Sequence, residues 1–174
     1  SLLKHSRYNP ANAALGGPGG HFDYLVIGGG SGGVSSARRA ATYGAKVALI
    51  EGTPNLGGTC VNVGCVPKKI MFNTASINEA IHDARHFGYD IPEHRFDWGK
   101  IKGARDRYVK KLNGIYHNNV GKAGVTMVYG MAAFVGPKSV RVEDVEYTAE
   151  HILIAVGGLP TMPDIPGVEL CMDR

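Results

Sequence analysis

Two cysteines five positions apart, Cys60 and Cys65 within GGTCVNVGCVPKK at residues 57–69, are the residues of this chain best placed to carry chemistry. In a straight α-helix this offset would separate them by about 7.5 Å along the axis and place them on different faces. A disulfide needs Cα atoms roughly 4.4–6.8 Å apart, so the chain must curl, and Gly64 permits the curl. Pro67 then fits the first turn of a following helix. A looped cysteine pair that opens a helix is suited to reversible redox chemistry.

Two other interpretations of Cys60 and Cys65 are buried small hydrophobic residues and half of a metal site. Zinc sites usually have four ligands, and no matching Cys/His pair lies at a suitable spacing. His82 and His86 are four residues apart on an expected helix but do not complete such a set, so we expect no metal. One close pair plus the isolated Cys171 suits a reducing compartment, where a disulfide is usually catalytic.

A glycine string satisfies the pattern G-x-G-x-x-G, with Gly28, Gly30 and Gly33 at the required places. The first glycine permits a tight turn, the second lets a pyrophosphate approach the backbone, and the third lets helix and strand pack closely. The helix N-terminus then presents free N–H groups to that anion. Glu51, eighteen residues beyond Gly33, ends the next strand and can accept hydrogen bonds from a ribose. The string predicts dinucleotide binding but does not separate FAD from a nicotinamide cofactor.

The elements around these motifs form a β-α-β unit, which implies a parallel sheet and a right-handed crossover, and therefore an α/β fold. Residue patterns predict strands at 22–27, 46–51, 125–129, 132–135, 139–142 and 147–156, and helices at 34–43, 67–85 and 97–119. Asp97 is the expected N-cap of the last helix. Residues 52–66 are expected to be a loop, and the later strands a meander and a return strand.

Composition limits the remaining function classes. With 174 residues, 44% of them hydrophobic, the chain is long enough for one domain with a proper core. The net charge of +4 is mild, and no basic run is interleaved with aromatic residues, which argues against nucleic-acid binding. No apolar run reaches the ~18 residues that a membrane span needs. Residues 1–21 are basic and contain no acid, as in a flexible leader or the remnant of a transit peptide.

The two motifs, DYLVIGGGSGG at residues 23–33 and GGTCVNVGCVPKK at residues 57–69, closely resemble those of the pyridine nucleotide–disulfide oxidoreductases, in particular their glutathione reductase branch. The resemblance extends over about residues 22–167. It implies a Rossmann-like FAD-binding domain with a parallel sheet, a redox-disulfide helix and a β-meander, incomplete relative to the family. It also implies that this dinucleotide site holds FAD, tightly bound, one per subunit.

The resemblance further implies roles for individual side chains. Electrons would pass from NADPH to FAD and then to a Cys60–Cys65 disulfide. Cys65, nearer the flavin, would form the charge-transfer thiolate, while Cys60 would attack oxidised glutathione and form a mixed disulfide. Lys68 would lie by the isoalloxazine ring as a third catalytic residue. A lowered thiol pKa suits both cysteines, and we expect the helix start, Lys68 and the flavin to supply it.

The implied ligand contacts fall into two sets. The positions matching FAD contacts are Gly28, Gly30, Ser31, Gly32, Gly33, Glu51, Thr59, Cys60, Lys68, Ala132 and Gly157. The positions matching glutathione contacts are Ser31, Arg38 and Tyr116. On chemistry alone, Arg38 would be a solvated helix residue and Tyr116 a core aromatic.

Several enzyme types share this scaffold, including dihydrolipoamide dehydrogenase, mercuric reductase, trypanothione reductase and the large thioredoxin reductases. Lys69 after Lys68 favours the glutathione, trypanothione and thioredoxin types. Arg38 favours an anionic substrate, and oxidised glutathione is net negative whereas trypanothione is net cationic. Glutathione disulfide is therefore the expected substrate, with thioredoxin-type and trypanothione-type reductases as alternatives.

We expect three segments: a leader at residues 1–21, the N-terminal part of an FAD-binding domain at 22–167, and a connection towards an NADPH domain at 168–174. Members of the family are more than twice as long and add an NADPH domain and a dimer-interface domain that supplies a catalytic His–Glu pair. The expected functional unit is a homodimer, located in the cytoplasm and also in mitochondria, and this chain alone is expected to be inactive. The alternative is a short, non-catalytic FAD-binding module.

Overall fold

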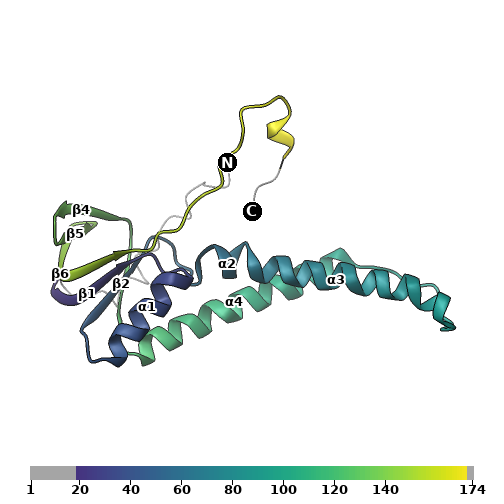
Figure 1. Ribbon diagram of the computed structural model, residues 1–174, viewed down its shortest axis with the longest axis horizontal. Helices are drawn as coiled ribbons and strands as arrows, with labels where there is room; N and C mark the ends of the chain where they lie inside the picture. Colours follow the sequence, from purple (N-terminus) through teal and green to yellow (C-terminus); the bar gives the residue numbers. More distant parts are fainter. Residues whose placement is uncertain (1–18, 172–174) are drawn as a thin grey trace.

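The structure is a computed structural model that describes residues 19–171. Its elements are β1 (His21–Ile27), α1 (Ser31–Thr42), β2 (Val47–Glu51), α2 (Gly58–Asn62), α3 (Cys65–Ala84), the 3₁₀ turn η2 (Arg85–Phe87), α4 (Trp98–Lys122), β3 (Thr126–Tyr129), β4 (Ala132–Gly136), β5 (Ser139–Val142), β6 (Val145–Ile154) and the 3₁₀ turn η3 (Val168–Leu170). Figure 1 shows the strands gathered at one end, with α3 and α4 running away from them as a two-helix arm.

One six-stranded sheet combines a parallel half and an antiparallel half, in the order β3-β2-β1-β6-β5-β4. β1 pairs in parallel with β2 and β6, and β2 pairs in parallel with β3. β4, β5 and β6 form the antiparallel meander. The two halves share β6, whose first residues pair with β5 and whose later residues pair with β1. The expected parallel sheet, meander and return strand are all confirmed.

Successive side chains of the central strands point to opposite sides of the sheet, and both sides are buried. On one face Leu25 and Ile50 pack with Val140 of the meander. On the other face Val26 and Leu49 pack with residues of α1 and α4. Strands covered on both sides contain nearly continuous apolar runs, which explains why β1 and β2 were recognisable in the sequence.

Most helix boundaries also agree with the sequence. Gly44 and Gly88 follow the ends of α1 and η2 in left-handed conformations, with φ of 84° at both positions. Asp97 caps α4, its Oδ1 accepting a 3.0 Å hydrogen bond from the backbone N–H of Lys100. α4 continues to Lys122 instead of ending at residue 119, because its last turns pack against the core through Val120.

Two helices differ from the prediction at their N-terminal ends. α1 begins at Ser31, three residues earlier than expected, since the glycines that suggested a loop adopt helical geometry. α3 begins at Cys65, which leaves Pro67 in its first turn, as expected. The expected loop at residues 52–66 contains the short helix α2, and this part of the prediction was wrong. A helix this short has no periodic pattern long enough to recognise.

The two-helix arm exposes most of its side chains. Pro67 is the buried residue of α3, and Asn113 and Val120 are the buried residues of α4. Among residues 19–171, no helix is both long enough and apolar enough to cross a membrane. The expected leader at residues 1–21 lies mostly outside the described part, as do the last three residues of the expected connection.

The start of α1 is packed tightly against the end of β1. A Cβ atom on Gly33 would overlap the carbonyl oxygen of Gly28, and the next nearest side chain is that of Val26. Gly32, on the adjacent face of the same helical turn, has nothing within 4 Å of such an atom. The third glycine of the string is therefore required by backbone packing.

We expect Gly33→Ala to destabilise the fold by at least about 2 kcal/mol, because backbone must move to relieve the overlap. Gly32→Ala is the matched control and should stay within about 1 kcal/mol of the wild type, shifted towards higher stability by the better helix propensity of alanine. Urea unfolding followed by circular dichroism measures both changes. Equal stability of the two variants would contradict the packing argument.

Candidate functional site

The carboxyl ends of the parallel strands meet at one edge of the sheet, and the glycine string begins there. The backbone N–H of Gly28 donates a 2.8 Å hydrogen bond to the carbonyl of Ile50 on β2. Gly28 has a φ of 107°, and a Cβ atom on it would overlap the carbonyl oxygen of Ala155, which follows β6. In open α/β sheets this edge is where ligands bind.

Glu51 ends β2 beside the glycine string, at the end of the strand as the sequence predicted. Its Oε2 accepts a 2.7 Å hydrogen bond from the backbone N–H of Gly29, and its Oε1 accepts from the backbone N–H and the hydroxyl of Thr53 at 2.8 and 2.9 Å. Burial and the negative charge of Glu51 raise the pKa of the neighbouring Tyr129. A carboxylate accepts about four hydrogen bonds, so it retains capacity for a ligand hydroxyl.

The N-terminus of α1 is open to an anion. Gly30, the N-cap residue, has no side chain that could cap the helix, and the first turn contains no acidic residue. The first α1 residues beyond it, Ser31 and Gly32, are exposed. The helix dipole and the free N–H groups of this turn favour a phosphate or pyrophosphate.

Two further predicted contact positions follow strands of the parallel half. Ala132 begins β4 just after β3, whose Tyr129 pairs with Glu51. Gly157 follows β6, whose Ile154 pairs with the last residue of β1. Gly157 is exposed and has a φ of 70°, and a Cβ atom on it would have nothing within 4 Å. The glycine string, Glu51 and Gly157 thus lie at the carboxyl ends of β1, β2 and β6, and Ala132 lies three residues after the end of β3.

The glycine string also touches the cysteine motif. The backbone N–H of Gly57 donates a 2.8 Å hydrogen bond to the carbonyl of Gly29. A Cβ atom on Gly58 would lie 2.7 Å from the Cα of Gly30. Gly57 and Gly58 both have positive φ, at 107° and 58°, so the chain turns sharply here into α2, which carries Thr59 and Cys60. The two motifs are joined through backbone alone.

Cys60 and Cys65 lie together as free thiols. A hydrogen bond between the two thiols, followed by burial and by the charge of Cys65, raises the pKa of Cys60. For the protein groups alone, this direction of the Cys60 pKa is opposite to the expected lowering, and the effect of the flavin stays a prediction. Lys68 does act in the expected direction, since its positive charge lowers the Cys60 pKa, but its contribution is smaller.

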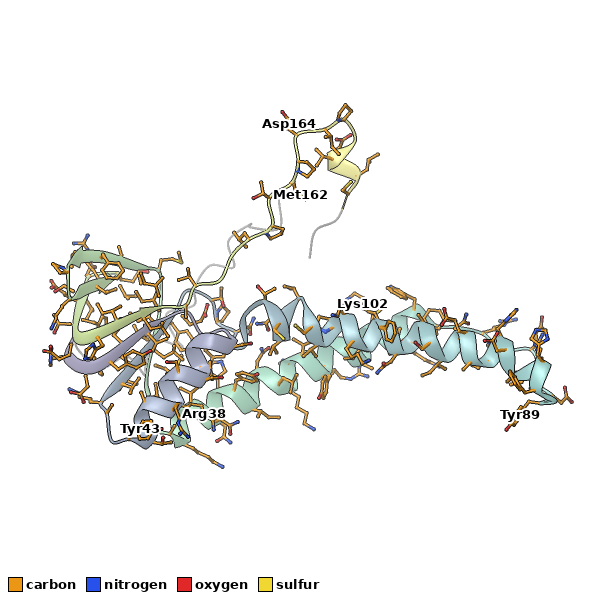
Figure 2. All side chains as sticks on the ribbon, in the orientation of Figure 1. Arg38, Tyr43, Tyr89, Lys102, Met162 and Asp164 are labelled. Atoms are coloured by element: carbon orange, nitrogen blue, oxygen red, sulfur yellow. The ribbon has the colours of Figure 1, made fainter. Side chains whose placement is uncertain are left out.

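The predicted substrate residues come from the two helices that cover the sheet. Arg38 is exposed near the C-terminal end of α1, where α1 packs on α4 (Figure 2), and it has no ion-pair partner within residues 19–171. Tyr116 of α4 is partly buried against the core cluster that contains Val34 and Ala37. Both interpretations of Tyr116 agree with this placement. Within the described residues, neither side chain shares a hydrogen bond or an ion pair with the cysteines, so their roles remain predictions.

Sequence reasoning missed the pairing of two asparagines, Asn62 within the cysteine motif and Asn113 on α4. Asn113 is the buried polar residue of the described core, and its Nδ2 donates to the carbonyl of Leu56 and to Oδ1 of Asn62, both at 2.8 Å. The sequence contained a signal, because Asn113 lies four residues after Val109 and seven before Val120, on the inward face of α4. A polar side chain at such an inward-facing position needs a hydrogen-bond partner within the protein.

A crevice of about 700 Å³ lies beside Cys65, between α3 and α4, and it too was not anticipated. Its lining includes Cys65, Lys69, Arg105 and Tyr108. Arg105 is paired with Asp106. In the described part of the chain, no three His, Cys, Asp or Glu side chains are grouped so as to hold a metal ion.

Comparison with known proteins agrees with this geometry. The sequence profile of the family described as pyridine nucleotide-disulphide oxidoreductase matches residues 22–174. The chain belongs to the pyridine nucleotide–disulphide oxidoreductase family. The chain is 54% identical to a glutathione reductase of Schizosaccharomyces pombe over 160 residues, and 51% identical to a glutathione reductase of Yarrowia lipolytica over 167 residues.

The two alignments cover 87% and 88% of this chain but only 34% and 35% of the relatives. The chain therefore spans about a third of the length of the curated relatives it matches. The family agrees with the Rossmann-like α/β fold described above.

We expect Cys65→Ala to lower the pKa of Cys60. The variant removes the thiol hydrogen bond and the charge that raise it, and keeps the backbone N–H of residue 65, which lowers it. Because the thiolate is the reactive form, Cys60 should be alkylated faster at neutral pH than in the reduced wild type. Peptide mass spectrometry after timed iodoacetamide treatment measures the rate across a pH series.

Cys171→Ala is the matched control, because Cys171 is exposed and lies in the segment after β6. It should leave the Cys60 rate unchanged. A slower or unchanged Cys60 rate in Cys65→Ala would show that the neighbouring thiol does not raise the Cys60 pKa.

Proposed function

We propose that this chain is the FAD-binding, redox-cysteine part of an NADPH-dependent glutathione-disulfide reductase. The observation that carries the proposal is the backbone contact between Gly29–Gly30 and Gly57–Gly58, which joins a dinucleotide-binding loop to the helix carrying Cys60. The identity to two proteins named glutathione reductase supports the choice of substrate.

The residues at the sheet edge fit a dinucleotide. A Cβ atom on Gly30 would have only the Cα of Gly58 nearby, at 3.7 Å, and Cβ atoms on Gly32, Gly157 and Gly158 would have nothing within 4 Å. A ligand can therefore approach the backbone closely at these positions. We assign the pyrophosphate to the start of α1 and a ribose hydroxyl to Glu51. When bound, FAD supplies two-electron transfer between a reduced nicotinamide and a disulfide.

The two thiols can reduce a disulfide by exchange. The Cys60 thiolate attacks one sulfur of glutathione disulfide, which forms a mixed disulfide and releases one glutathione thiolate. The Cys65 thiolate then attacks the Cys60 sulfur, which closes the Cys60–Cys65 disulfide and releases the second glutathione. Lys68, exposed and without an ion-pair partner within residues 19–171, favours thiolate at Cys60 through its charge.

Unpaired positive charge supports an anionic substrate. Arg38 is exposed and makes no ion pair in the described part of the chain, so its guanidinium is available to a carboxylate. Ser31 lies seven residues before Arg38 on the same helix, about 10 Å along its axis, which is within the span of a tripeptide. We assign Arg38, Ser31 and Tyr116 to glutathione. NADPH binding and homodimer formation belong to the proposed whole protein.

We expect reduced Cys65→Ser, treated with glutathione disulfide, to accumulate one glutathione per chain on Cys60. The second exchange step cannot occur without the Cys65 thiol, so the mixed disulfide persists. The wild type should instead form the internal disulfide and release glutathione. Mass spectrometry of the intact protein and of its peptides distinguishes these products.

Cys60→Ser and Cys171→Ser are the controls for this experiment. Cys60→Ser should trap glutathione more slowly than Cys65→Ser, and Cys171→Ser should behave like the wild type. An adduct that forms faster on Cys65 would reverse the assigned thiol roles. Equal or faster reaction with oxidised trypanothione or thioredoxin would remove the preference for glutathione.

Binding of FAD tests the other half of the proposal. We expect Glu51→Gln to raise the Kd for FAD about tenfold, because the amide keeps the shape of the side chain but loses the charged acceptor for a ribose hydroxyl. Glu146→Gln, an exposed change on β6, is the control and should leave the Kd unchanged. Flavin fluorescence titration measures both values. Failure of the wild type to bind FAD would contradict the proposed function.

A further inference from the structure

α2, the helix that carries Cys60, is too short to be stable on its own. α2 has only five residues, and its N-cap residue, Gly57, has no side chain that could cap the helix. Isolated helices shorter than ~12 residues are marginal in water, so α2 depends on contacts with the rest of the protein. The backbone of Gly57 ties its start to the glycine string, and the side chain of Val61 is buried in the interior.

The other end of α2 is tied down by a chain of amide hydrogen bonds. Asn62, the last residue of α2, donates from Nδ2 to the carbonyls of Gly58 at 2.9 Å and Leu56 at 3.4 Å. Its Oδ1 accepts a 2.8 Å hydrogen bond from Nδ2 of Asn113 on α4, and Asn113 also donates to the carbonyl of Leu56. We call the two side chains Asn62 and Asn113 the amide brace.

The polar atoms of the amide brace are satisfied, and its two members are buried (Asn113) and half-buried (Asn62). Asn113 is 9% exposed and uses both of its Nδ2 hydrogens, and within residues 19–171 no buried side-chain nitrogen or oxygen lacks a partner. Removing Asn62 would leave a hydrogen on Nδ2 of the buried Asn113 unpaired, and removing Asn113 would take away the donor to Oδ1 of Asn62. The brace therefore links the segment from Leu56 to Asn62, and with it Cys60, to the middle of a 25-residue helix.

We propose that Asn113 is a positioning residue that acts through Asn62 to hold Cys60 against Cys65, and so sets the stability of the Cys60–Cys65 disulfide relative to the dithiol. The two thiols are on different helices, Cys60 on α2 and Cys65 at the start of α3. Their encounter depends on α2 keeping its place. A fixed geometry raises the effective concentration of one thiol at the other.

The bond change is a balanced two-electron oxidation. In the dithiol each sulfur carries a proton, and in the disulfide one Sγ–Sγ bond replaces the two S–H bonds. With oxidised dithiothreitol as oxidant, two electrons and two protons pass to the reagent, whose own S–S bond breaks to give two thiols. Loss of the brace lets α2 sample other positions in the dithiol form, which shifts this equilibrium towards the dithiol.

This inference rests on the redox cysteine pair of the proposed function, but not on FAD, NADPH or glutathione. Dithiothreitol mixtures report the dithiol–disulfide equilibrium directly. A protein that binds no FAD or does not react with glutathione would contradict the proposed function and leave the brace experiment interpretable. An unchanged equilibrium in the brace variants would contradict only the present inference.

The experiment compares the purified wild type with Asn113→Ala, Asn62→Ala and the double variant. Each is equilibrated with graded ratios of reduced to oxidised dithiothreitol, quenched with acid, alkylated and analysed by mass spectrometry. Because two net hydrogen bonds are lost, we expect Asn113→Ala to lower the disulfide equilibrium constant about tenfold. The double variant should have a disulfide equilibrium constant no lower than that of the more strongly affected single variant, because both residues act in the same chain of hydrogen bonds.

Asn118→Ala is the matched control, an exposed asparagine on the same helix, and should keep the wild-type constant. Circular dichroism establishes that each variant is folded. If folded Asn113→Ala keeps the wild-type disulfide equilibrium constant, the inference is overturned. It is also overturned if the effects of the two single variants on this constant multiply in the double variant. If Asn113→Ala does not fold, a wild-type constant in Asn62→Ala overturns it, and a several-fold lower constant supports it.

Discussion

The contact on which the rest of this molecule depends is the backbone approach of Gly29 and Gly30 to Gly57 and Gly58. A side chain at Gly58 would not fit this junction, because a Cβ atom there would lie 2.7 Å from the Cα of Gly30. Through this contact the edge of a parallel sheet, where dinucleotides bind, is continuous with the turn that starts the cysteine helix. Glu51 also contacts this junction, since its carboxylate accepts from the N–H of Gly29, whose carbonyl accepts from Gly57.

The electrostatics of the cysteine pair follow from this arrangement. Bringing the two thiols into hydrogen-bonding contact stabilises the protonated form of Cys60, and Lys68 opposes this only in part. The chain by itself therefore holds the pair close without activating Cys60. A reactive thiolate at Cys60 needs a further group that lowers its pKa. In the proposed whole protein, that group would be the bound cofactor or a residue from the part of the relatives' length that this chain does not span.

The fold and much of the candidate site could be predicted from residue order. β1, β2 and the meander strands were recognisable because their apolar runs and turn glycines are local signals, and Asp97 was recognisable as an N-cap for the same reason. The helix α2 and the amide brace were not. α2 is too short for periodicity, and the partner of Asn113 is 51 residues away in the sequence, so the pairing depends on how α4 folds back beneath the cysteine motif.

By itself the sequence determined which chemistry the chain can offer: a glycine string with an acid in register, and two cysteines that must curl towards each other. These features depend on residue type and on spacings of a few positions, which local backbone geometry translates directly. The tertiary structure alone decided how these groups influence one another. It showed that the dinucleotide loop and the cysteine turn share a backbone contact, that the neighbouring thiol raises the Cys60 pKa, and that α4 braces α2. Hydrogen bonds and charges act over a few ångströms, and only the folded chain brings distant residues that close.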